Sequence, residues 1–96
     1  MMLVLTYDVD TSDAEGARRL RNVAKLCERY GMRVQNSVFE VIVDAAQLTV
    51  LKAELGQLID PKCDSIRLYR LGNAYMNRIE TMGKTPKVQA GSTLIF

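Results

Sequence analysis

The chain has 96 residues, of which 48% are hydrophobic and 25% charged, and its formal net charge is +2. This length predicts one domain, and the composition is that of a folded globular protein rather than a disordered or fibrous one. The sequence contains no histidine, which excludes every mechanism that needs an imidazole base, nucleophile or metal ligand from this chain.

The first apolar run covers residues 1–7 and ends at Asp8. Residues 2–7 predict a largely buried strand, because they mix β-branched, aromatic and aliphatic side chains over too short a length for a helix. The run has no basic leader and is too short to span a bilayer, so we expect a cytoplasmic protein without membrane contact. Without histidine, hydrolysis has to depend on carboxylates, basic groups and a bound ion, and Asp8 is the first candidate ligand.

The next segment predicts a helix over residues 14–30. Cap-forming side chains precede it, Glu15 follows Ser12 at the spacing of a capping box, and Gly31 is expected to end the helix. One face of this helix is apolar. The opposite face carries a basic stripe, formed by Arg18, Arg21, Lys25 and Arg29. We interpret the stripe as a nucleic-acid contact because it follows Asp8 closely, and the alternative is an ordinary solvated surface.

Two further strands, a second helix and a fourth strand follow. Residues 32–43 predict an antiparallel hairpin with a bend at residues 35–37. Asp44 is expected to cap a helix over residues 45–59, whose leucines recur at the helical period. Residues 65–71 alternate polar and apolar side chains, as a strand with one buried face does. The order βαββαβ predicts a ferredoxin-like α+β fold, a four-stranded antiparallel sheet with two helices on one face.

Residues 1–71 would form this domain, and residues 72–96 differ from it in character. Glycines and a proline break this tail, which ends in the apolar residues 92–96. We expect the tail to add a strand at a dimer interface, because the sheet of such a fold has exposed edges and one uncovered face. The alternative is a frayed terminus.

Four segments together resemble the small CRISPR-associated nuclease family Cas2. They are residues 4–9 (VLTYDV), 28–31 (ERYG) at the end of an arginine-rich helix, 33–40 (RVQNSVFE) and 64–71 (DSIRLYRL). The resemblance spans roughly residues 2–71, in the order and spacing of the family. A Tyr-Asp pair alone is a weak signal, but together with Gln35-x-Ser37-Val38-Phe39 it is specific.

The resemblance implies a homodimer that works in CRISPR spacer acquisition, where it bridges two dimers of the partner integrase and holds the incoming DNA duplex. Some members of the family are described as divalent-metal-dependent endonucleases on RNA or double-stranded DNA. By this resemblance, Asp8 is the metal-site carboxylate, contributed once by each protomer, and the ion is Mg²⁺ or Mn²⁺.

The resemblance also assigns further site residues. Tyr7, Arg33 and Phe39 match positions linked to activity or substrate contact. The helix arginines of the family align loosely with Arg18, Arg19 and Arg21, and Lys25 continues this nucleic-acid-binding surface.

Other interpretations stay open at this point. Asp8 is also suited to capping the strand end, and Tyr7 and Phe39, in predicted strands, are also typical core residues. Asp10 is a candidate second ligand, although a capping role suits its position better. Three functions remain: a metal-dependent endonuclease, a non-catalytic DNA-holding adaptor of the integrase complex, and a ferredoxin-like regulatory domain that binds a small molecule.

Overall fold

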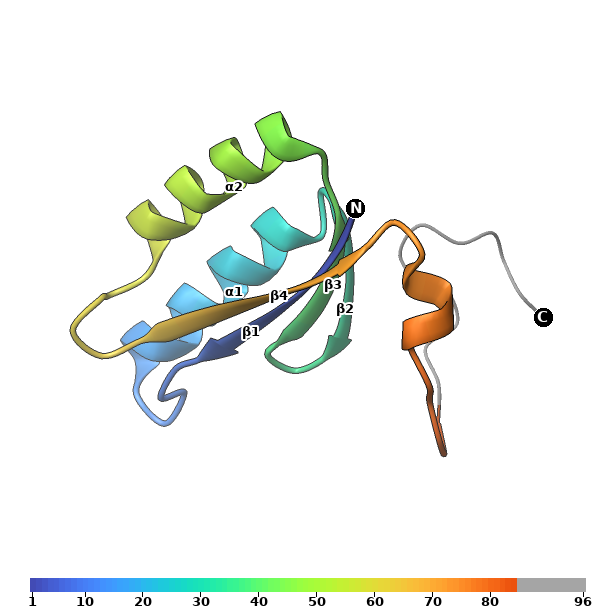
Figure 1. Ribbon diagram of the computed structural model, residues 1–96. Coiled ribbons are helices and arrows are strands. Elements are labelled where there is room, and N and C mark those ends of the chain that lie inside the picture. The colour runs from blue at the N-terminus through green and yellow to red at the C-terminus, as the bar shows by residue number, and fades with distance from the viewer. Residues whose placement is uncertain (85–96) are drawn as a thin grey trace.

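The computed structural model describes residues 1–84 and has two layers, a sheet and a pair of helices on one of its faces (Figure 1). The elements in chain order are β1 (Met2–Asp8), α1 (Ala14–Cys27), β2 (Gly31–Gln35), β3 (Val38–Ile42), α2 (Ala45–Leu58) and β4 (Ser65–Gly72). The strands lie in the order β2-β3-β1-β4, and every neighbouring pair is antiparallel. The predicted ferredoxin-like α+β fold is confirmed.

The core lies between the sheet and the helices. β1 contributes Leu3, Leu5 and Tyr7, and β3 contributes Phe39 and Val41. The facing residues of the helices are Leu20, Val23, Ala24, Leu26 and Cys27 in α1 and Leu48, Leu51 and Leu55 in α2. Burial of a side chain of this size contributes roughly 1.5–3 kcal/mol, so the core fixes which face of each strand points inward.

α1 begins at Ala14, as predicted, but its capping residue and its end differ from the prediction. Its N-cap is Asp13, whose side chain accepts hydrogen bonds from the backbone N–H of Glu15 and Gly16, at 2.7 and 3.0 Å. The helix ends at Cys27, before the predicted residue 30. Gly31 does not terminate the helix, because it is the first residue of β2, where an added Cβ would lie 1.8 Å from the carbonyl oxygen of Glu40. Close approach of two strands explains this glycine.

The predictions for the hairpin, the second helix and the fourth strand are confirmed. β2 and β3 are joined by residues 36 and 37. Asp44 caps α2 through a complete capping box, in which it accepts from the Gln47 N–H at 2.7 Å and its own N–H donates to Gln47 Oε1 at 3.0 Å. β4 extends one residue beyond the predicted range, to Gly72.

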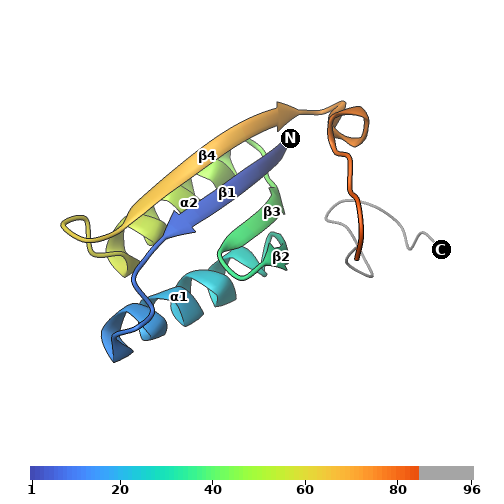
Figure 2. The same cartoon turned by 90° about the horizontal axis from the view of Figure 1, so that it is seen from below.

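The segment after β4 leaves the two-layer domain (Figure 2). It contains the short 3-10 helix η1 (Tyr75–Arg78), and residues 73–84 contain no strand. The apolar end at residues 92–96, for which a strand is predicted, lies outside the described residues. No helix in the described part of the chain has the length and apolar character that a membrane crossing requires.

Candidate functional site

Asp8 is exposed at the last position of β1, opposite Ser65 of β4. Alternation along the strand places Val4, Thr6 and Asp8 on the face that the helices leave uncovered. Within residues 1–84 its carboxylate has no hydrogen bond or ion pair. It does not cap the following loop, where the Asp10 carboxylate accepts from the Ser12 N–H and hydroxyl at 2.9 and 2.6 Å. Asp8 is therefore available to a ligand from outside.

One carboxylate is too few ligands for a metal ion. The described residues contain no group of three or more Asp, Glu, Cys or His side chains that could hold one. Mg²⁺ and Mn²⁺ favour oxygen ligands and retain several waters, so the donor type at Asp8 suits them. A site at Asp8 needs additional oxygen ligands from a second molecule.

Tyr7, next to Asp8 in sequence, points to the other side of the sheet. Its side chain is buried under the helices, and its hydroxyl donates a hydrogen bond to the Asp64 carboxylate. Burial, reinforced by this hydrogen bond, raises the pKa of Tyr7 to about 12. The geometry makes Tyr7 a core residue, as in the alternative interpretation, and it gives the phenol no direct contact with a substrate.

Asp64 is a buried acid beside the candidate site, and its position in the sequence predicted no role for it. Its side chain is fully buried and accepts from Arg19 Nε and Nη2, at 2.8 and 3.2 Å, and from the Asp60 N–H at 3.0 Å. Burial by itself raises the pKa of Asp64, but hydrogen bonds from Arg19 and Tyr7 outweigh it and hold the pKa below its usual value. Its sequence signals were an acid directly before an alternating strand and its place in the segment 64–71 that resembles the Cas2 family.

Arg19 therefore differs from the other predicted nucleic-acid contacts. Its ion pair with Asp64 holds it between α1 and the sheet, and the hydrogen bond from its guanidinium raises its pKa further. Arg18, Arg21 and Lys25 are exposed on α1. Arg18 makes an exposed ion pair with Glu15 at 3.3 Å, and Arg29, at the far end of the stripe, lies 3.8 Å from Glu54. The exposed stripe thus has a net positive charge.

Arg33 and Phe39 form a contact of their own. Phe39 is fully buried, and the Arg33 guanidinium carbon lies 5.8 Å from the centre of its ring. Arg33 also donates to the backbone oxygen and the side-chain oxygen of Asn36, at 2.7 and 3.2 Å, so it holds the β2–β3 turn. That turn adjoins the Asp8 end of β1, because the Tyr7 N–H donates to the Ser37 carbonyl at 2.9 Å.

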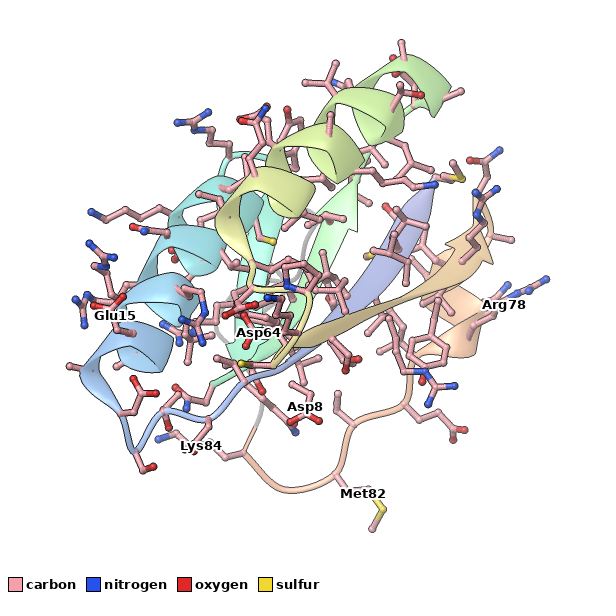
Figure 3. All side chains as sticks on the ribbon, turned by 90° about the vertical axis from the view of Figure 1, so that its left-hand side faces the viewer. Asp8, Glu15, Asp64, Arg78, Met82 and Lys84 are labelled. Carbon is pink, nitrogen blue, oxygen red and sulfur yellow. The ribbon has the colours of Figure 1, made fainter. Side chains whose placement is uncertain are left out.

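The predicted residues thus fall into two groups. One group lies at one end of the sheet and comprises Asp8, the β2–β3 turn held by Arg33, and the start of α1, from which Lys25 continues the basic stripe along the helix. Tyr7, Arg19 and Phe39 are directed toward the core. Asp8 and Asp64 lie on opposite sides of the strands, as Figure 3 shows.

Comparisons with known proteins agree with this fold. The family model for CRISPR associated protein Cas2 matches residues 1–79. A protein of Halalkalibacterium halodurans named CRISPR-associated endonuclease Cas2 is 55% identical over 96 residues, the full length of both chains. A Rhodospirillum rubrum protein named CRISPR-associated endoribonuclease Cas2 3 is 51% identical over 99% of this chain and 100% of its own.

Solved structures show the same likeness. The crystal structure of Streptococcus pyogenes Cas2 at pH 6.5 has a TM-score of 0.82 and 54% identity, and the match covers 86% of this chain and 100% of that one. A hypothetical protein from Thermus thermophilus has a TM-score of 0.71 and 30% identity over 88% of this chain and 93% of its own. The chain belongs to the Cas2 family of CRISPR-associated proteins.

Proposed function

We propose that this protein is a homodimeric, nucleic-acid-binding subunit of CRISPR spacer acquisition, with metal-dependent endonuclease activity on RNA or double-stranded DNA. The observation that carries the proposal is the exposed Asp8 carboxylate, which has no partner within residues 1–84. Relatives that are 55% and 51% identical are named endonuclease and endoribonuclease, which supports phosphodiester hydrolysis.

The proposed ion is Mg²⁺ or Mn²⁺, held by Asp8 from each of two protomers. Two carboxylates, waters and substrate phosphate oxygens together satisfy the coordination that such hard cations require. The bound ion would polarise the phosphodiester and lower the pKa of a water. Asp8 holds the ion, and the exposed arginine and lysine side chains at the start of α1 attract the phosphate backbone.

One face of the sheet is suited to contact a second copy of the chain. The face of the sheet opposite the helices carries the half-buried apolar side chains of Val4, Val38 and Ile42. Near Val38, residues 79–84 of the same chain lie across a hollow of about 340 Å³. Asp8 belongs to the same face, since it follows Val4 at the two-residue period of the strand. Pairing of two such faces would bury the apolar side chains and bring two Asp8 residues into one assembly.

Substitution of Asp8 tests the enzymatic proposal. We expect Asp8→Asn to reduce Mn²⁺-dependent cleavage of RNA and duplex DNA by at least about 100-fold, because it removes the anionic ligand while preserving side-chain size. EDTA should abolish the wild-type activity. Asp10→Asn is the matched control, since the Asp10 carboxylate is already occupied by Ser12, and it should retain activity. Full activity in Asp8→Asn would overturn the proposal.

A second function, a DNA-holding adaptor of the integrase complex, is favoured by the separate basic stripe. Arg21 and Lys25 are exposed on α1 and have no partner among the described residues. Asp8→Asn should then bind duplex DNA as the wild type does, whereas Arg21→Glu/Lys25→Glu should weaken binding at every sequence and flatten its salt dependence. Equal binding by the charge-reversed protein would contradict the adaptor role.

A further inference from the structure

We propose that Tyr7, Arg19 and Asp64 form a buried network that positions Asp8 for metal binding. The inference rests on the proposed function, because that function assigns the metal ion to Asp8. In this network Tyr7 and Arg19 are positioning residues that act through the backbone, and Asp64 joins them. None of the three contacts the ion or the nucleic acid.

The Asp64 carboxylate is fully satisfied by donors. The Tyr7 hydroxyl, the Arg19 guanidinium and the Asp60 N–H all donate to it, and the guanidinium does so through two nitrogens at 2.8 and 3.2 Å. The side chain of Asp64 is 0% exposed and that of Arg19 is 18% exposed. A charged pair so far removed from water is held in one geometry, because either partner alone would be a buried charge.

The network joins three elements around Asp8. Tyr7 belongs to β1 and directly precedes Asp8, whereas Arg19 belongs to α1. Asp64 directly precedes Ser65, which is the cross-strand partner of Asp8 in β4. Tyr7, which precedes Asp8, therefore donates to the carboxylate of Asp64, which precedes Ser65. This contact lies on the side of the sheet opposite to Asp8 (Figure 3).

This arrangement holds the backbone at Asp8 in place, which the side chain of Asp8 does not do. Asp8 is the last residue of β1, its side chain has no partner in the described part of the chain, and strand ends open locally more readily than strand centres. Side chains that hydrogen-bond to a metal ligand commonly change metal affinity by about 10–100-fold when they are removed, and we expect indirect support to act at the lower end of that range. The network supplies such support through the backbone, without occupying the face on which Asp8 lies.

Mn²⁺ binding, followed by electron paramagnetic resonance, tests the inference on the intact protein. Tyr7→Phe removes one neutral donor and leaves the Arg19–Asp64 pair, so we expect it to fold and to weaken Mn²⁺ binding about tenfold. Asp64→Asn should weaken binding further. Arg19→Lys keeps the charge but loses the two-nitrogen contact, and should fall between Arg19→Ala and the wild type.

A control of similar stability separates positioning from general destabilisation. Val43→Ala creates a cavity at the opposite end of the sheet, where the Val43 N–H donates to the Met1 carbonyl. It should bind Mn²⁺ as the wild type does and should cleave nucleic acid with the same metal requirement. Cleavage by Tyr7→Phe should recover at high Mn²⁺ concentration, since the chemistry at Asp8 is intact. Wild-type Mn²⁺ affinity in Tyr7→Phe and Asp64→Asn would overturn the inference.

Amide hydrogen exchange distinguishes failure of the inference from failure of the proposed function. The Tyr7 N–H donates to Ser37 at the Asp8 end of the sheet, and the Val43 N–H reports on the other end. Asp64→Asn should accelerate exchange at Tyr7 at least about tenfold more than it accelerates exchange at Val43, because global destabilisation affects both amides and the lost network affects Tyr7 alone. If the wild type shows no Asp8-dependent Mn²⁺ binding, the proposed metal site fails. Unchanged exchange at Tyr7 in Asp64→Asn would overturn the positioning network, whether or not the wild type binds Mn²⁺ at Asp8.

Discussion

Acidic side chains on the two faces of the sheet differ in burial and in hydrogen bonding. On the helix-covered side, Asp64 is fully buried and accepts hydrogen bonds from Tyr7, Arg19 and Asp60. On the uncovered side, Asp8 is exposed and has no partner within the described residues. A satisfied buried carboxylate stabilises the fold, whereas an exposed carboxylate without a partner contributes little to stability and can bind a cation. The buried acid and the exposed acid thus lie on opposite faces of one sheet.

Glu40 is a third case, on the uncovered face. It alternates with the core residues Phe39 and Val41 and lines a hollow of about 340 Å³ between the β2–β3 hairpin and residues 79–84. The residue is buried, and its Oε1 has no hydrogen-bond partner within residues 1–84. Burial raises the pKa of Glu40. Its carboxylate therefore has the environment that Asp64 would have without its donors.

The largest effect on stability is expected at Asp64. Asp64→Asn should lower the free energy of unfolding by roughly 3 kcal/mol, because it breaks a buried charged pair and leaves Arg19 without its anion. Urea denaturation measures this. Asp44→Asn is the matched control, since asparagine caps a helix about as well as aspartate, and its effect should be small. A loss below about 1 kcal/mol at Asp64 would make the pair equivalent to a surface ion pair.

The pH dependence of stability should have opposite signs at the two buried acids. The pKa of Asp64 is held low in the folded state, so its contribution is complete above about pH 3.9, the usual aspartate pKa, and is lost as the pH falls below that value. The pKa of Glu40 is raised, so its charged form costs stability as the pH rises above about 4.3, the usual glutamate value. Urea denaturation of Asp64→Asn and Glu40→Gln across pH 3–7 isolates each contribution.

Glu40→Gln should have an intermediate effect, in the stabilising direction. The change removes a buried charge, and we expect a gain of about 1 kcal/mol at pH 7 that disappears near pH 4. The thermal midpoint at the two pH values provides the measurement. A loss of stability at pH 7 would show that the Glu40 carboxylate has a partner in solution.

Arg18→Ala should have the smallest effect on folding. The Arg18 and Glu15 side chains are 62% and 72% exposed, so their ion pair is worth at most about 0.5 kcal/mol. Binding of duplex DNA should weaken slightly, and the slope of log affinity against log salt should fall by about one unit. An unchanged slope would remove Arg18 from the nucleic-acid surface.

The fold was largely predictable because its signals are local. Turn residues separate each strand and helix, and the two-residue period of 65–71 and the capping box at Asp44 both act over a few residues. The end of α1 was not, because Gly31 fits two explanations. A helix terminus and a close approach to Glu40 both favour glycine, and only the pairing of β2 with β3 distinguishes them.

The candidate site was predictable only in part. Alternation along β1 already implies that Tyr7 points away from Asp8. The helical period places Arg19 on the same face of α1 as the buried residues Val23 and Leu26, rather than within the basic stripe. Asp64 gives no comparable signal, because its partner Arg19 lies 45 residues away in sequence. Such a contact is decided by how α1 packs on the sheet beside the start of β4.

The most direct test of Asp8 as the metal-binding carboxylate is a crystal structure of the protein soaked in Mn²⁺, with anomalous difference density measured at the manganese edge. We predict a peak within coordination distance of the Asp8 carboxylates of two protomers, absent in Asp8→Asn, and no peak at Asp64. Density at Asp10 or Asp13 with none at Asp8, or a peak that persists in Asp8→Asn, would contradict the account.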